Sequence, residues 1–207
     1  ASGGLGSAGI DAETFIEKVR QAFRELTDEM FVLLGCFSEL RIEDDIGGTE
    51  TVFRLKTIDS SRTADTERKQ VAIFRNDVET ARFLMYERSL PGFEKLEGDI
   101  CVAIRITKAE TGHLSLDPDV PESGPPFHLF FPTQIPSGLP LLLHAYFEVG
   151  ASREQFAADS KERNDRLLLG LHDLAVDAIA DIGAMSQAGH LDVSLLPELF
   201  GGARSQK

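Results

Sequence analysis

The chain has 207 residues, of which 42% are hydrophobic and 27% charged, a balance typical of a globular domain and not of a disordered or fibrous chain. Its formal net charge of −13 disfavours broad nucleic-acid binding, because such a surface repels phosphate backbones and no run of Lys or Arg supplies a local basic patch. The sequence contains no apolar run of membrane-spanning length, and its two cysteines, Cys36 and Cys101, lack C-x-x-C spacing. We therefore expect a cytoplasmic protein with reduced thiols and no membrane contact.

Residues 1–10, ASGGLGSAGI, carry no charge and lack the G-K-[ST] ending of a phosphate-binding loop, so we expect a flexible leader or a domain junction. Asp11 should then cap a helix of about fifteen residues. The apolar face of this helix is predicted to consist of Phe15, Ile16, Val19, Phe23 and Leu26. The next segment, MFVLLGCF at 30–37, is apolar and predicts either a buried helical turn or a buried strand.

From residue 40 the hydrophobic period changes to two, which indicates β-strands. Leu40–Ile42 and Thr51–Ile58 flank Gly47-Gly48, a good signal for a hairpin. Further strands are expected at 69–75, 82–87, 99–107, 127–131 and 141–149. Most connections are too short for parallel crossovers, so the pattern predicts a largely antiparallel or mixed sheet.

Asp159 and Glu162 have the spacing of a capping box and predict the start of a long helix. Its apolar stripe should cover one face of the sheet and consists of Leu167, Leu171, Leu174, Ala178, Ile182 and Met185. The predicted fold class is therefore α+β, with an N-terminal helix and a long C-terminal helix packed on the sheet. We expect a single domain over residues 11–187 and a C-terminal tail over 188–207.

The usual signatures of catalytic and metal sites are absent from the sequence. The histidines are scattered, without H-x-x-x-H or H-E-x-x-H spacing, so no metal site is predicted. His144 lies in an apolar segment, which is typical of a structural histidine. There is no G-x-S-x-G elbow, Walker A motif, G-x-G-x-x-G loop or Bergerat ATP-binding motif. We therefore do not expect an enzyme in isolation.

The strongest functional signal lies at Arg153. The preceding loop QIPSGLP is stiffened by Pro136 and Pro140, and an apolar run then leads to Gly-Ala-Ser-Arg-Glu. Arg153 should lie just beyond a rigid strand with its guanidinium projecting outward, and such a fork suits phosphate oxygens. The alternative is a surface arginine paired with Glu148 or Glu154, which the spacing alone favours.

The stretch FFPTQIPSGLPLLLHAYFEVGASRE, residues 130–154, resembles the middle segment of ATPases related to sacsin and the ninety-kilodalton heat-shock chaperones. The resemblance implies a middle, transducer-like domain that follows a Bergerat-fold (GHKL) ATP domain, which these residues do not include. Arg153 would contact the terminal phosphate of ATP, and Ser152 and Glu154 would shape its loop. The implied scaffold positions are Pro132, Thr133, Gly138 and Pro140.

The same resemblance implies ATP with Mg²⁺ as the cofactor of the full-length protein and no cofactor in this chain itself. The implied partner is the N-terminal ATP-binding domain of the same protein, together with client or partner proteins. A different class of function is also open, namely a free-standing protein-interaction module with no catalytic role.

Overall fold

The structure is a computed structural model that describes residues 12–34, 37–45, 47–94, 96–109, 113–117 and 124–195. The expected leader, the Asp11 cap, Cys36 and most of the C-terminal tail lie outside the described residues.

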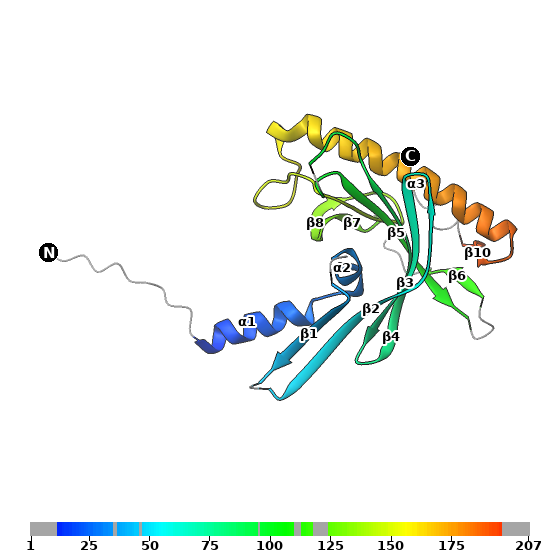
Figure 1. Cartoon of the computed structure of the whole chain (residues 1–207). Helices are drawn as coiled ribbons and strands as arrows, with labels where there is room; N and C mark the ends of the chain where they lie inside the picture. Colours follow the sequence, from blue (N-terminus) through cyan, green and yellow to red (C-terminus); the bar gives the residue numbers. More distant parts are fainter. Residues whose placement is uncertain are drawn as a thin grey trace, which may run out of the picture.

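Ten strands of the described residues form one sheet (Figure 1). They are β1 (Glu39–Asp44), β2 (Thr49–Thr63), β3 (Thr66–Arg75), β4 (Val78–Ser89), β5 (Asp99–Lys108), β6 (Leu114–Leu116), β7 (Pro126–Leu129), β8 (Phe131–Pro136), β9 (Leu142–Ala145) and β10 (Leu191–Asp192). Their order is β1-β2-β3-β4-β5-β9-β7-β8, with β6 paired to β5 and β10 paired to β6. The β7–β9 and β6–β10 pairs are parallel and the other described pairs antiparallel, which confirms the predicted α+β class.

The hairpin predicted at Gly47-Gly48 joins β1 to β2, and Gly48 has the positive φ of 65° that such a turn requires. Strands β2 to β4 run further than the apolar pattern predicted. Their outer halves are polar and are joined by cross-strand pairs such as Arg88 Nε to Thr66 Oγ1 at 3.0 Å. Hydrophobic periodicity cannot detect a strand that is held this way.

In the apolar segment at 30–37 the helix runs to Leu33, while Leu34 is its C-cap and Phe37 lies in neither a helix nor a strand. Helix α2 (Asp28–Leu33) begins after Thr27, whose side chain accepts a hydrogen bond from the Met30 amide. It covers one face of the sheet with Phe31, Val32 and Leu33, all buried. Opposite them lie apolar residues of the central strands: Phe53, Val71, Ile73, Phe83, Ala103 and Leu142.

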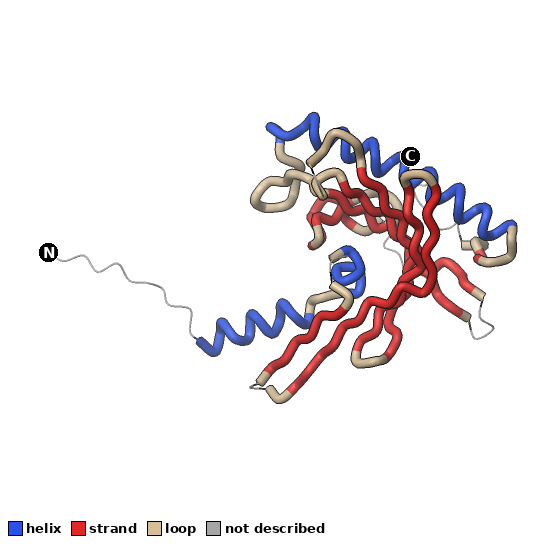
Figure 2. The backbone as a smooth tube through the Cα atoms, viewed as in Figure 1, coloured by secondary structure: helices blue, strands red, loops and turns tan. Residues whose placement is uncertain are grey.

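Helix α3 (Lys161–Gln187) covers the opposite face of the sheet (Figure 2). The predicted stripe is confirmed, because its leucines, Ala178 and Ile182 are buried and Met185 is partly buried against the same cluster. The predicted capping box is wrong. A 3₁₀ turn, η1 (Ala158–Ser160), precedes the helix, whose N-cap Ser160 makes no capping hydrogen bond because its hydroxyl binds the Glu148 carboxylate instead.

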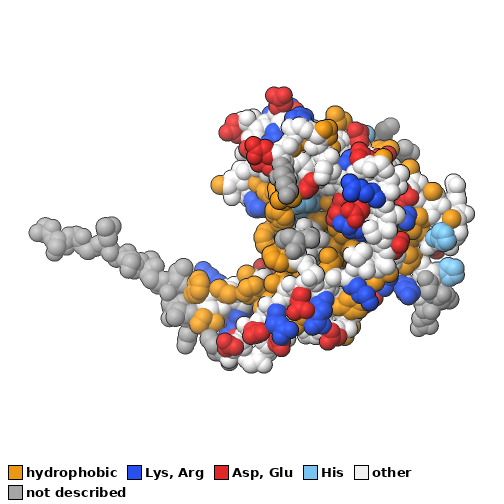
Figure 3. Space-filling view, in the orientation of Figure 1, with side chains coloured by type: hydrophobic (Ala, Val, Ile, Leu, Met, Phe, Trp, Pro, Cys, Tyr) orange, Lys and Arg blue, Asp and Glu red, His pale blue; other side chains and the backbone are white. Residues whose placement is uncertain are grey.

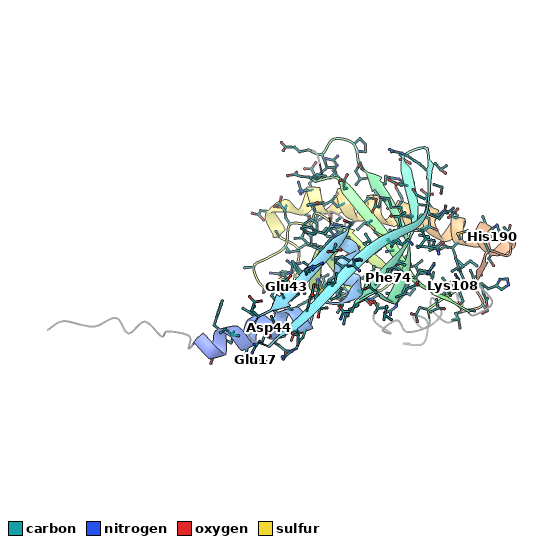
Figure 4. The ribbon with its side chains drawn as sticks, turned by 60° about the horizontal axis from the view of Figure 1, so that its bottom comes forward. Glu17, Glu43, Asp44, Phe74, Lys108 and His190 are labelled. Carbon is teal, nitrogen blue, oxygen red and sulfur yellow. The ribbon has the colours of Figure 1, made fainter. Side chains whose placement is uncertain are left out.

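Helix α1 (Ala12–Arg24) is present as predicted, but its apolar face is not buried in the core. Phe15 remains 57% exposed and Phe23 47% exposed. One ion pair joins the helix to the sheet, because Arg20 of α1 lies 2.8 Å from Asp44 at the end of β1. The 3.7 Å pair between Arg20 and Glu17 lies within α1; Figure 4 labels both carboxylates. No helix of the described ranges is both long and apolar enough to cross a membrane.

Candidate functional site

The candidate site is built around the turn between β7 and β8. The strand predicted over 127–131 breaks at Phe130, whose φ of 59° lies in the left-handed region that a bulky residue rarely adopts. Phe131 instead begins β8, which continues to Pro136 and so takes in the first three residues of the expected loop QIPSGLP. The strand predicted over 141–149 is correspondingly shorter, since β9 ends at Ala145.

The loop that carries Arg153 is closed by its own backbone. Val149 and Phe156 form an antiparallel bridge across it, and the Gly150 amide donates to the Gln155 carbonyl at 3.0 Å. Inside the loop, the Arg153 amide donates to the Gly150 carbonyl at 2.8 Å, and the φ of Arg153 is 59°. These contacts fix the position from which the Arg153 side chain starts.

The Arg153 guanidinium folds back over the β7–β8 turn instead of projecting outward. Its Nη2 donates to the carbonyl oxygens of Phe131 at 2.7 Å and of Leu129 at 3.3 Å, the two residues that flank Phe130. Its Nε is buried and has no hydrogen-bond partner within the described ranges. The arginine and the left-handed turn therefore support each other.

The spacing favours the alternative in which Arg153 pairs with a carboxylate, Glu148 or Glu154. The structure does not contain such a pair. Arg153 makes no ion pair with any described residue, whereas Glu148 contacts the Arg163 Nε at 3.4 Å. Backbone carbonyls are neutral, so they orient the guanidinium without cancelling its charge. The arrangement fits an approaching anion, because a positive charge is held in place and no acid of the described ranges pairs with it.

The two neighbours of Arg153, Ser152 and Glu154, are both exposed. The Ser152 carbonyl lies 3.5 Å from Gln134 Nε2, and the Arg153 carbonyl accepts from the Gln134 amide at 2.8 Å. The loop is therefore tied to β8 through the backbone.

The four scaffold positions have different roles. Thr133 is buried and its hydroxyl donates to the Phe127 carbonyl at 2.8 Å, which ties β8 to β7. Gly138 has a φ of 70°, so it supplies the left-handed turn before β9. Pro132 and Pro140 line a cavity beneath the turn.

Two buried histidines support the turn, and His144 has the structural role that its apolar surroundings indicated. Burial lowers the pKa of His144 to about 4, and its Nδ1 lies 3.3 Å from the Phe130 amide and 3.2 Å from the His128 carbonyl. The Phe130 ring packs against His144 and Tyr146, with centroid separations of 5.1 Å to each. No hydrogen bond joins His144 to Ser152 within the described ranges, so a Ser–His nucleophile is not assembled there.

Sequence reasoning missed Asn164, which is only 2% exposed in the first turn of α3. Its carboxamide binds the backbone of Glu148, directly before the Arg153 loop. A signal for it exists in the sequence: Asn164 precedes Leu167 and Leu171 by three and seven residues, which places a polar side chain on the buried stripe of the helix.

Within the described part of the chain, no three His, Cys, Asp or Glu side chains come together in a way that could hold a metal ion. Comparisons with protein-family models, curated protein sequences and solved structures gave no match to this chain.

Proposed function

We propose that this chain is the middle, transducer-like domain of a sacsin-like or chaperone-like ATPase. In this proposal Arg153 contacts the terminal phosphate of ATP bound, with Mg²⁺, to a separate N-terminal domain of the same protein. The chain is then not an enzyme in isolation, but it supplies one charged group to an active site built elsewhere.

The observation that carries the proposal is the way in which Arg153 is held. Two neutral carbonyls orient its guanidinium, and no carboxylate among the described residues pairs with it. Most other arginines of the described ranges pair with acids, as Arg88 does with Asp177 at 2.6 Å and Arg105 with Asp117 at 3.0 Å. An uncompensated cation on an acidic protein is suited to bind an anion.

The Arg153 guanidinium has N–H groups left over that could donate hydrogen bonds to a phosphate. A guanidinium has five N–H groups, and the two carbonyls engage only Nη2. The N–H groups of Nη1 have no partner within the described ranges, and a phosphate oxygen approaching the turn could accept from them. Because the loop backbone is already ordered, contacting a phosphate would require little further loss of conformational entropy.

Such a contact would have two effects. Charge that develops on the phosphates during hydrolysis would be stabilised by a fixed cation. The ATP-bound and empty states of the N-terminal domain would also bind this domain differently, which couples nucleotide state to domain docking.

The test is ATP hydrolysis by the natural full-length protein, with Arg153→Ala beside the wild type. We expect the substitution to lower the turnover number on the order of 10²-fold with nucleotide binding retained. The matched control is Arg166→Ala, since Arg166 also donates to a backbone carbonyl, that of Pro91 at 2.9 Å, but lies on α3 away from the turn. Unchanged turnover in Arg153→Ala would overturn the role of Arg153.

The second candidate function is a free-standing protein-interaction module. It is favoured by the exposed apolar face of α1, which borders a groove of about 420 Å³ together with Ile42 and Phe53 of the sheet. A full-length protein that neither binds nor hydrolyses ATP would favour this function over the first.

A further inference from the structure

A cavity of about 620 Å³ lies between α2 and the face of the sheet, next to the β7–β8 turn. In Figure 3 hydrophobic side chains gather around the centre of the molecule, where α2 faces the sheet. The apolar lining comes from α2, five strands and the flanking loops: Met30, Phe83, Ala103, Leu142 and Pro125, Pro126, Pro132 and Pro140. Proline side chains have little freedom to collapse inward, so the cavity is largely preformed.

The two charged residues of the described lining, Glu29 and Arg105, pair with each other. Arg105 lies 3.0 Å from Glu29 and, through its Nε, 3.0 Å from Asp117. The cation is therefore already paired on two sides. A charged occupant would have to be desolvated without gaining an uncompensated partner, which is unfavourable. The lining favours a neutral occupant.

His128 contributes a polar ring to the lining of this cavity. His128 is 3% exposed, and its Nδ1 lies 2.9 Å from the Pro126 carbonyl. A carbonyl oxygen can only accept, so Nδ1 carries the proton. Burial lowers the pKa of His128, which keeps the ring neutral and makes Nε2 a hydrogen-bond acceptor. Within the described ranges Nε2 has no partner.

We propose that this cavity binds a small, neutral and mainly apolar ring compound that donates one hydrogen bond to His128 Nε2. The volume lies in the range of small-molecule sites, which combine apolar walls with a few fixed polar groups. The site stands independently of the ATPase role of Arg153. Its wall nevertheless includes His128 and Pro132, which directly flank the turn that Arg153 holds.

The proposal can be tested with two probes of nearly equal shape, indole and 1-methylindole, titrated into the ¹⁵N-labelled chain and followed by ¹H–¹⁵N NMR. We expect saturable shifts at amides of the lining strands, including Ala103, His128 and Leu142. Indole should bind about 2- to 10-fold more tightly than 1-methylindole, which is what one net hydrogen bond contributes.

A variant distinguishes the contribution of the hydrogen bond to binding from the contribution of the apolar cavity. His128→Phe keeps a ring in place but removes the acceptor, so the two probes should bind it equally. His172→Phe, at an exposed histidine of α3, should preserve the difference between them. If His128→Phe does not fold, the comparison of the two probes on the wild type still decides the question. Equal affinities on the wild type, no saturable shift, or shifts confined to the α1 groove would overturn the proposal.

Discussion

The carboxamide of Asn164 binds both backbone polar groups of Glu148. Its Oδ1 accepts from the Glu148 amide at 2.9 Å, and its Nδ2 donates to the Glu148 carbonyl at 2.8 Å. Asn164 thereby joins the first turn of α3 to the segment between β9 and the Arg153 loop. Since the same carbonyl also accepts from the Ala157 amide at 2.9 Å, the two ends of that loop meet at one residue.

Replacing Asn164 should destabilise the fold. We expect Asn164→Ala to lower the free energy of unfolding by about 2 kcal/mol, because a buried backbone amide loses its partner. Asn164→Asp should also be destabilising, since a carboxylate cannot donate to the Glu148 carbonyl. Urea denaturation measures both. Asp165→Ala is the control, because Asp165 is exposed and, among the described residues, pairs with Lys161 alone, and it should change stability by less than about 0.5 kcal/mol.

His144 should make stability fall as the pH falls. Burial lowers its pKa from 6.5 to about 4, so the folded state favours the neutral ring. The stabilisation is complete above the unfolded pKa of 6.5 and is lost as the pH drops from there toward 4. Between pH 7.5 and 5 we expect a loss of about 2 kcal/mol, measured by urea denaturation at each pH.

The matched variant for this pH effect is His144→Phe, which keeps an aromatic ring among Phe130 and Tyr146. It should be less stable than the wild type at pH 7.5, because Nδ1 no longer binds the backbone of the turn. Its stability should depend less on pH, with a remaining slope from His128, whose pKa is also lowered by burial. An unchanged slope would show that His144 is not the titrating group.

Two glycines of α3 should respond oppositely to alanine. A Cβ at Gly170 would lie 2.5 Å from Leu90 Cδ1 and 2.8 Å from its Cδ2, whereas a Cβ at Gly183 would meet nothing within 4 Å. Gly183→Ala should therefore raise the free energy of unfolding by about 0.5–1 kcal/mol through helix propensity. Gly170→Ala should lower it, since Leu90 must move. Thermal unfolding of the two variants in parallel checks this; a gain of stability in Gly170→Ala would contradict the close packing.

The left-handed backbone of Arg153 predicts a difference between two substitutions that both remove its side chain. At a φ of 59° a residue with a Cβ is strained and glycine is not. Arg153→Gly should therefore be more stable than Arg153→Ala by about 1 kcal/mol. Equal stabilities in urea denaturation would mean that the loop is not held in this conformation in solution.

Local sequence signals predicted the parts of the fold that depend on local properties. The stripe of α3 follows from the helical spacing of its leucines, and the β1–β2 hairpin follows from Gly47-Gly48. The capping box failed because Asp159 lies inside the 3₁₀ turn η1 and α3 begins only at Lys161, after Ser160. The Ser160 hydroxyl in turn binds the Glu148 carboxylate, twelve residues away in the chain, and such a tertiary contact is not visible in the spacing.

In the candidate site, too, local features were predictable and tertiary contacts were not. The sequence placed Arg153 in a loop after an apolar strand, and the structure has it there. Its contacts were not predictable, because they reach back 22 and 24 residues to a turn that is itself unusual. Nothing local indicates a left-handed Phe130, which is supported by His144 and Arg153 from distant parts of the chain.

Strand β8 lies at one end of the sheet order, a position at which exposed amides commonly recruit another chain. Here two of its residues, Pro132 and Pro136, have no amide proton, while the Gln134 amide is taken by the Arg153 carbonyl and the Ile135 amide by the Thr133 hydroxyl. This edge of the sheet is therefore poorly suited to the addition of another strand, which protects it against aggregation through edge-to-edge pairing. A protein that docks beside Arg153 is therefore expected to recognise side chains there and not to extend the sheet.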